Sequence, residues 1–407
     1  MIPALSGLLD QGVANQVFPA AQAAVWLDGR WVHRSTHGQL AGRPTEPGDL
    51  FDIASVTKLV CTTLAIACLV DDGAIELDDP VSRYLPLFAR NGKRYISVRQ
   101  LLGHSSGLPA WRPFFTEALR DPVASSVYPS AVDELRVSRA IGFERARELV
   151  LTAALIEPQE APPGNRVYSD LGFIALGELV SAVSGLDLDA FFAERITAPL
   201  GLTQTRYFDL RAPVFSQQAI ACTGRTRPRE PAPGQEELFR VPPQAPALVP
   251  GEVDDDNAWA LHGIAGHAGL FSTADEVNRV GQALLADLGG AERLLRADTV
   301  RAFMAPDTGV SGPLRSLGFD RIAPVGSSAG SRLGQGARGG LGHLGFTGCS
   351  LWLDLDRGLV VSLLTNRTLF GREHGARIRA FRPRFHDLVA EWVDEDDLAP
   401  TDVGDRA

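Results

Sequence analysis

Ser55 and Lys58 lie three residues apart at the start of an apolar run, where a hydroxyl and an amine could act together on a carbonyl carbon. Residues i and i+3 share one face of a helix, so a helix that begins here would bring the two side chains within reach of each other. The first turn of a helix also stabilises developing negative charge. The spacing therefore predicts a nucleophilic serine, although S-x-x-K also arises by chance.

Lysine is scarce in this chain, because only Lys58 and Lys93 are lysines among its 39 Lys and Arg residues. An ammonium group can lose its proton when its surroundings lower its pKa, whereas a guanidinium group stays charged in proteins. A retained lysine is therefore a candidate for proton transfer, with chance retention as the alternative.

Two further segments carry groups that acyl transfer needs. Tyr168 stands where a β-like stretch gives way to a helical one, and it would offer a phenolic hydroxyl; a buried core aromatic is the alternative. His343 and Gly345 stand near the end of an expected strand, between glycines that permit close approach of a ligand; a glycine-rich turn with an exposed histidine is the alternative. Backbone N–H groups from this strand and from Ser55 would form an oxyanion hole.

A sheet assembled from both chain ends is the element that would position these segments. Asp28-Gly29 and Asp356-Arg357-Gly358 separate β-rich apolar runs and predict one antiparallel hairpin near each end. Apolar patterns between the hairpins predict helices over residues 59–70, 98–102, 146–155, 171–183 and 275–285. The predicted fold class is α+β, with flanking helices, an inserted helical region and a cleft where the parts meet.

The predicted organisation is a single unit over residues 1–393. Residues 1–55 and 265–393 form its sheet region, and residues 56–264 form its mainly helical region. Seven prolines predict a long surface loop over residues 227–250. Residues 394–407 are acidic and lack aromatic side chains, so they are expected to form a frayed tail.

Composition excludes several classes of function. The formal net charge of −10 argues against a nucleic-acid partner held through phosphate contacts. The chain has no apolar run of about 18 residues, so no membrane partner is expected. It has no Lys or Arg before Arg30, so a cytoplasmic location is expected.

The acidic run Asp254–Asp256 is expected to be a solvated loop rather than a metal site. His262 and His267 are expected to have turn or core roles.

The three segments, taken in this order, resemble the serine β-lactamase and penicillin-binding protein superfamily, in particular its class C-like and esterase branch. The resemblance covers residues 16–366 and includes the stretches 101–109, 266–273 and 363–366. It implies that Ser55 is the acylated nucleophile, that Lys58 is its partner on the helix, and that Tyr168 shares or relays the proton.

The resemblance also implies which residues bind substrate. Asp170 stands where the family usually has Asn, and His343-Leu344-Gly345 stands in place of the family's Lys-Thr/Ser-Gly strand. The amides of Ser55 and Phe346 would form the oxyanion hole. Asp170, His343, Gly345 and Phe346 are therefore the expected substrate-binding residues.

Departures from the family pattern bear on the substrate. Because His343 has a reference pKa of about 6.5 and Leu344 has no hydroxyl, a substrate carboxylate should be held weakly. Asp170 near Lys58 would favour the ammonium form, and Lys58 would then hold Tyr168 closer to phenolate, as the base. His343 and Leu344 together favour esters or amides over efficient β-lactam turnover.

The predicted function is a serine hydrolase that acts through an acyl-serine on a small ester, amide or lactam. No metal and no organic cofactor is expected, and no oligomeric state is predicted. A β-lactamase proper or a D-Ala-D-Ala carboxypeptidase is the first alternative. A non-catalytic protein that binds a peptide or cell-wall fragment is the second.

Overall fold

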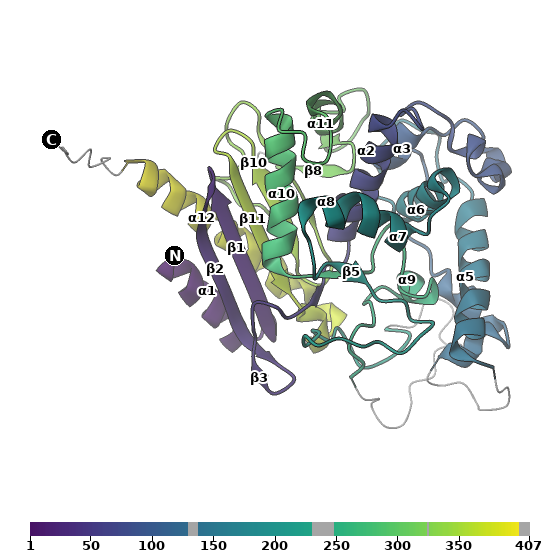
Figure 1. Cartoon of the computed structure of the whole chain (residues 1–407), viewed down its shortest axis with the longest axis horizontal. Helices are drawn as coiled ribbons and strands as arrows, with labels where there is room; N and C mark the ends of the chain where they lie inside the picture. Colours follow the sequence, from purple (N-terminus) through teal and green to yellow (C-terminus); the bar gives the residue numbers. More distant parts are fainter. Residues whose placement is uncertain (129–136, 230–247, 324, 399–407) are drawn as a thin grey trace.

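A large antiparallel sheet built from both ends of the chain is the central element of the molecule (Figure 1). The computed structural model describes residues 1–128, 137–229, 248–323 and 325–398. The strand order is β3-β2-β1-β11-β10-β9-β8-β7, so the first and last hairpins pair directly along β1 and β11. These strands are β1 Ala20–Leu27, β2 Arg30–Leu40, β3 Arg43–Pro44, β7 Arg315–Ser316, β8 Phe319–Arg321, β9 Gly340–Leu344, β10 Ser350–Asp354 and β11 Leu359–Thr365.

The turns of the two outer hairpins have the conformations that their sequences indicate. Asp28 and Gly29 both have positive φ, 38° and 84°, as a type I′ turn requires. Gly358 also has positive φ, 60°, where the chain enters β11. Both predicted hairpins are confirmed.

Strand β1 buries side chains on both faces of the sheet. Ala21 and Ala23 contribute to a core shared with α1 (Pro3–Ala14) and α12 (Gly375–Leu398), whereas Ala24 belongs to the core on the opposite face. This alternation follows from the two-residue period of a strand. Helix α10 (Ala274–Leu288) covers the second face, as Figure 1 shows, and separates the sheet from the helical region. The sheet is therefore buried between two layers of helices.

The helical region lies beyond α10 in Figure 1. Its α-helices are α2 Leu64–Asp71, α3 Val98–Leu102, α4 Phe115–Arg120, α5 Arg139–Ile156, α6 Asp170–Ser184, α7 Leu188–Phe192, α8 Ala198–Leu200 and α9 Asp256–Ala260, and helix α11 Ala297–Met304 follows α10. Two π-helical turns, η1 Lys58–Thr63 and η5 Ala193–Thr197, precede α2 and α8. A small second sheet joins β4 Phe51–Asp52, β6 Leu270–Ser272 and β5 Arg206–Tyr207 in the order β4-β6-β5.

Membrane-spanning potential is limited to one bent pair of segments. No single helix in the described ranges is long and apolar enough to cross a bilayer. Residues 170–184 and 188–200 meet the length and composition criteria only as a pair bent by 78°.

The predicted α+β class, with a sheet from both chain ends, is confirmed. The end of the chain differs from the prediction, because residues 394–398 continue α12 instead of starting a tail. The ion pair between Asp394 and Arg357, at 2.6 Å, holds this part of the helix against the β10–β11 turn. Residues 399–407 and most of the predicted proline-rich loop lie outside the described residues.

Candidate active site

A strained turn places Ser55 between the small sheet and the helix that follows. Ile53 donates its N–H to the carbonyl of Leu270 at 3.0 Å, which extends the pairing of β4 with β6. Ala54 then adopts φ +49°, a left-handed conformation that costs a non-glycine residue about 1 kcal/mol. The Asp52 carboxylate accepts the Ala54 N–H at 2.8 Å and stabilises this conformation. Ser55 is therefore presented at a fixed corner, immediately before the helix.

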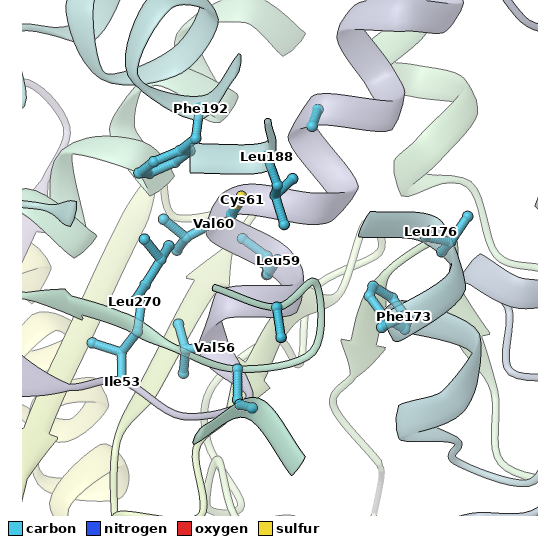
Figure 2. Packing of buried hydrophobic residues seen from close by; sticks show 14 of the residues in the cluster. Ile53, Val56, Leu59, Val60, Cys61, Phe173, Leu176, Leu188, Phe192 and Leu270 are labelled. Atoms are coloured by element: carbon cyan, nitrogen blue, oxygen red, sulfur yellow. The ribbon is translucent and has the colours of Figure 1, made fainter. Parts of the chain in front are cut away.

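The helix after Ser55 is buried, and it carries Lys58 into the core. Its apolar side chains pack against neighbouring strands and helices, as Figure 2 shows for Ile53, Val56, Leu59, Val60, Cys61, Phe173, Leu176, Leu188, Phe192 and Leu270. The predicted helix over residues 59–70 begins as the π-helical turn η1 and continues as α2. Lys58 itself has no exposed surface.

Three oxygen atoms lie close to the Lys58 amine. Its Nζ atom lies 2.9 Å from Ser55 Oγ, 2.9 Å from the carbonyl oxygen of His267 and 2.7 Å from Asp170 Oδ1. The geometry thus joins the predicted nucleophile to the predicted amine and adds a carboxylate on the other side.

The start of helix α6 brings Tyr168 and Asp170 to Lys58. Ser169 is the N-cap, with its Oγ 3.5 Å from the N–H of Gly172, and its own N–H donates to His104 Nδ1 at 3.0 Å. The Tyr168 ring lies 5.1 Å from Lys58 Nζ, and Lys58 and Ser55 both act to lower the pKa of the Tyr168 hydroxyl. Ser55, Lys58 and Tyr168 converge, as the sequence predicted.

Burial and charge fix the protonation states of this cluster. Burial by itself lowers the pKa of Lys58, but the negative charge of Asp170 and the interaction with Tyr168 together outweigh burial and leave the pKa above its usual value. Burial raises the pKa of Tyr168, and the opposing effect of the Lys58 ammonium does not cancel it. Lys58 is therefore an ammonium at neutral pH. It shifts Tyr168 toward phenolate, as expected, but burial outweighs this effect and leaves Tyr168 a neutral phenol.

The turn after β9 lies directly against the nucleophile turn. A Cβ atom on Gly345 would stand 2.5 Å from the carbonyl oxygen of Ile53, so only glycine allows this approach. The hydroxyl of Thr347 donates to the carbonyl of Asp52 at 2.7 Å and ties the two turns together. In the described part of the chain, neither the Ser55 N–H nor the Phe346 N–H donates to another protein group. Both amides remain available to a ligand.

His343 is buried rather than exposed on a turn. Its side chain lies on β9 with its ring 5.9 Å from that of Tyr168, and the residue is 1% exposed. Its Nδ1–H donates to the carbonyl of Leu344 at 2.8 Å, which leaves a lone pair on Nε2. Burial lowers the pKa of His343 to about 4, so the imidazole is neutral at neutral pH.

Phe346 is half-exposed at the rim of this region. Its ring lies 4.5 Å from the guanidinium carbon of Arg367 and 5.2 Å from that of Arg372. An apolar surface with adjacent cations is therefore the contact that Phe346 can offer a substrate.

The acidic run Asp254–Asp256 is the part of the site that sequence reasoning missed. It is not the expected solvated loop, because Asp254 is 3% and Asp256 is 4% exposed. The Asp254 N–H donates to Asp52 at 2.6 Å, and Asp256 pairs with Arg227 at 2.7 Å. The apolar residues that follow, 258–261, are the sequence signal from which burial of this run could have been predicted. No cluster with metal-ligand geometry exists among the described residues.

Comparison with known proteins identifies the family of this chain. A family model described as Beta-lactamase matches residues 5–382. The chain belongs to the Beta-lactamase family. Its fold and its grouping within the serine β-lactamase and penicillin-binding protein superfamily agree with the resemblance in the sequence, and as a family member it is a hydrolase.

Curated relatives are similar to this chain at low sequence identity but over most of its length. A Bacillus subtilis (strain 168) protein named N-acetylmuramyl-L-alanine amidase is 29% identical over 387 residues, which cover 88% of this chain and 80% of that protein. An Escherichia coli (strain K12) protein named "Putative D-alanyl-D-alanine carboxypeptidase" is 28% identical over 387 residues, which cover 88% and 81%.

Solved structures share the fold of this family member. The D-amino acid amidase from Ochrobactrum anthropi SV3 superposes with a TM-score of 0.65 at 21% identity, covering 98% of this chain and 100% of that one. EstCE1, a hydrolase with promiscuous acyltransferase activity, gives a TM-score of 0.65 at 21% identity, covering 93% and 97%.

Proposed function

We propose that this protein is a serine hydrolase that cleaves small esters or amides through an acyl-Ser55 intermediate. The observation that carries the proposal is the position of Lys58 Nζ, 2.9 Å from Ser55 Oγ and 2.7 Å from Asp170 Oδ1. This arrangement gives the hydroxyl proton of Ser55 a direct route to a carboxylate, which an activated serine requires.

The proton moves through Lys58 without a free amine in the resting enzyme. Ser55 Oγ attacks the carbonyl carbon while its proton passes to Lys58, and Lys58 passes one of its own protons to Asp170. Of the four groups in the cluster, only Asp170 carries a negative charge to receive that proton. Tyr168, whose ring lies 5.1 Å from Lys58 Nζ, then donates its proton to the leaving group as the carbon–heteroatom bond breaks. Lys58 reprotonates Tyr168 and recovers its own proton from Asp170, so the acyl-enzyme has the charges of the resting state. Water hydrolyses the acyl-serine by the same route in reverse.

Two backbone N–H groups stabilise the negative charge that develops on the carbonyl oxygen of the substrate. The N–H groups of Ser55 and Phe346 are unpaired in the described structure and belong to the two turns that Thr347 ties together. Fixed donors of this kind are worth roughly 10²- to 10³-fold in rate. Gly345 serves this geometry because it lets the second turn approach Ile53.

The substrate preference follows from His343. A neutral, buried imidazole with a lone pair on Nε2 accepts a hydrogen bond from a substrate but offers no charge to a carboxylate. Neutral esters and amides are therefore favoured over β-lactams, which carry a carboxylate. The names of the curated relatives favour a second candidate, cleavage of a D-alanyl-D-alanine peptide.

A labelling experiment followed by a substrate panel tests the proposal. A fluorophosphonate should label the wild-type protein covalently, and Ser55→Ala should abolish labelling. Ser105→Ala, which changes the serine of the G-x-S-x-G pattern at residues 103–107, should not. Among p-nitrophenyl esters, amino acid amides, a D-alanyl-D-alanine peptide and nitrocefin, the neutral substrates should have the highest kcat/KM. An unlabelled wild type would favour a non-catalytic binder, and a preference for the peptide or for nitrocefin would favour those alternatives.

A further inference from the structure

A buried histidine and its aspartate partner lie behind Lys58, outside the groups that carry the proposed reaction. The carbonyl oxygen of His267 accepts a hydrogen bond from Lys58 Nζ at 2.9 Å. The imidazole Nε2 of the same residue donates to Asp255 Oδ1 at 2.9 Å, and His267 is 1% exposed. We infer that Asp255 and His267 are positioning residues that fix Lys58 between Ser55 and Asp170. This inference rests on the proposed function.

The loop that carries His267 needs a side chain to hold it in place. Gly266 and Gly269 lie on either side, and Gly269 has φ +121°. Thr62 donates to the carbonyl of Gly266 at 2.6 Å, which holds the preceding peptide. The next carbonyl along the chain, that of His267, accepts the hydrogen bond from Lys58. The imidazole of His267 anchors this carbonyl through its hydrogen bond to Asp255.

Asp255 is itself held in a fixed position. Its Oδ1 accepts the N–H of Ala258 at 2.8 Å as the N-cap of α9. Burial by itself would raise the pKa of Asp255, but the interaction with His267 and these hydrogen bonds outweigh burial and lower that pKa. The adjacent N–H of Asp254 donates to Asp52, whose carboxylate supports Ala54 in the nucleophile turn. One short segment therefore supports both the turn with Ser55 and the loop that holds Lys58.

The inference concerns geometry rather than a proton carried by His267. The groups that face Lys58 directly are Asp170 and Tyr168, and Asp255 reaches Lys58 only through His267. Loss of the imidazole should release the carbonyl, let the amine drift from Ser55 and slow acylation. Displacement of a catalytic group by about 1 Å costs up to about 10²-fold in rate. Substrate binding, which these residues do not touch, should change little.

Three variants and one matched control test the inference. His267→Ala should lower kcat and the rate constant of fluorophosphonate labelling by about 10- to 100-fold and change KM by less than about threefold. His267→Gln keeps an N–H donor for Asp255 and should recover most of the rate. Asp255→Asn keeps an acceptor for Ala258 and should fall between the two.

The control is Asp287→Asn, which changes another buried aspartate, one that accepts the N–H groups of Arg293, Leu294 and Leu295 after helix α10. It should lower the Tm and leave the rate per labelled site unchanged. A His267→Ala variant that acylates at the wild-type rate per labelled site, or a His267→Gln variant no faster than His267→Ala, would overturn the inference alone. A wild type that takes no label would overturn the proposed function and this inference with it.

Discussion

The carboxylate of Asp170 lies 2.7 Å from the Lys58 ammonium and faces the solvent-accessible side of the cluster, since its side chain is 18% exposed and that of Lys58 is not exposed at all. A buried ammonium is stable only with a close counter-ion. The pair therefore keeps Lys58 charged in the resting state, and in the proposed reaction Asp170 is the final acceptor of the Ser55 proton.

The substitution Asp170→Asn tests this assignment. It removes the charge that raises the pKa of Lys58, while burial continues to lower that pKa. The variant must then use the free amine of Lys58 as its base, so the acid limb of its kcat/KM profile should move to higher pH, and the rate near pH 7 should fall by roughly 10²-fold. Asp78→Asn, which changes an exposed pair with Arg99, is the matched control. An acid limb at the wild-type pH would contradict the assignment.

Gly345→Ala should impair catalysis more than folding. The new Cβ would stand 2.5 Å from the Ile53 carbonyl and push the β9–β10 turn away from Ser55. Labelling should slow by about 10- to 100-fold, with a loss of about 1–3 kcal/mol in the free energy of unfolding. Gly309→Ala is the control, because nothing lies within 4 Å of its Cβ position. Equal labelling rates for the two variants would show that the close approach has no catalytic role.

His343→Lys should shift substrate preference toward carboxylates. A charged hydrogen bond contributes about 1.5–3 kcal/mol, so the ratio of kcat/KM for nitrocefin to that for p-nitrophenyl acetate should rise about 10- to 100-fold. His343→Gln, which adds no charge, should leave the ratio near its wild-type value. Similar ratios in all three proteins would exclude His343 as a determinant of specificity.

Acid should destabilise the protein through its buried histidines. His386 on α12 has Nδ1 3.0 Å from the carbonyl of Ser328, and burial lowers its pKa to about 4. The unfolded chain takes up this proton near pH 6.5 and the folded chain only near pH 4, so stability is lost as the pH falls between those values. His386→Gln should reduce the pH slope of the urea-derived free energy of unfolding by up to about 1.4 kcal/mol per pH unit. An unchanged slope would contradict a neutral His386.

Local features of the site were predictable because they depend on residues close in sequence. The three-residue spacing fixes Ser55 beside Lys58 within one helical turn, and the Asp28-Gly29 turn fixes the first hairpin. The helix start after Tyr168 was visible as a change from β-like to helical pattern. These parts required no information about distant segments.

The scarcity of lysine shows the limit of such reasoning. It singled out Lys58 and Lys93 alike, and both are buried. In the tertiary structure Lys93 donates to the carbonyls of Leu155, at 2.7 Å, and Glu157, at the end of α5. Lys93 therefore caps the end of α5, and only the position of α5 in the tertiary structure shows that its role differs from that of Lys58.

The sequence by itself determined the fold class, the family pattern and the residues of the nucleophile turn. Only the tertiary structure decided that Tyr168 is a neutral phenol, that His343 is a buried neutral imidazole and that Asp254–Asp256 supports the site. The physical reason is that spacing along a helix or turn sets local geometry, whereas burial and the neighbouring charges that set a pKa come from segments brought together by folding.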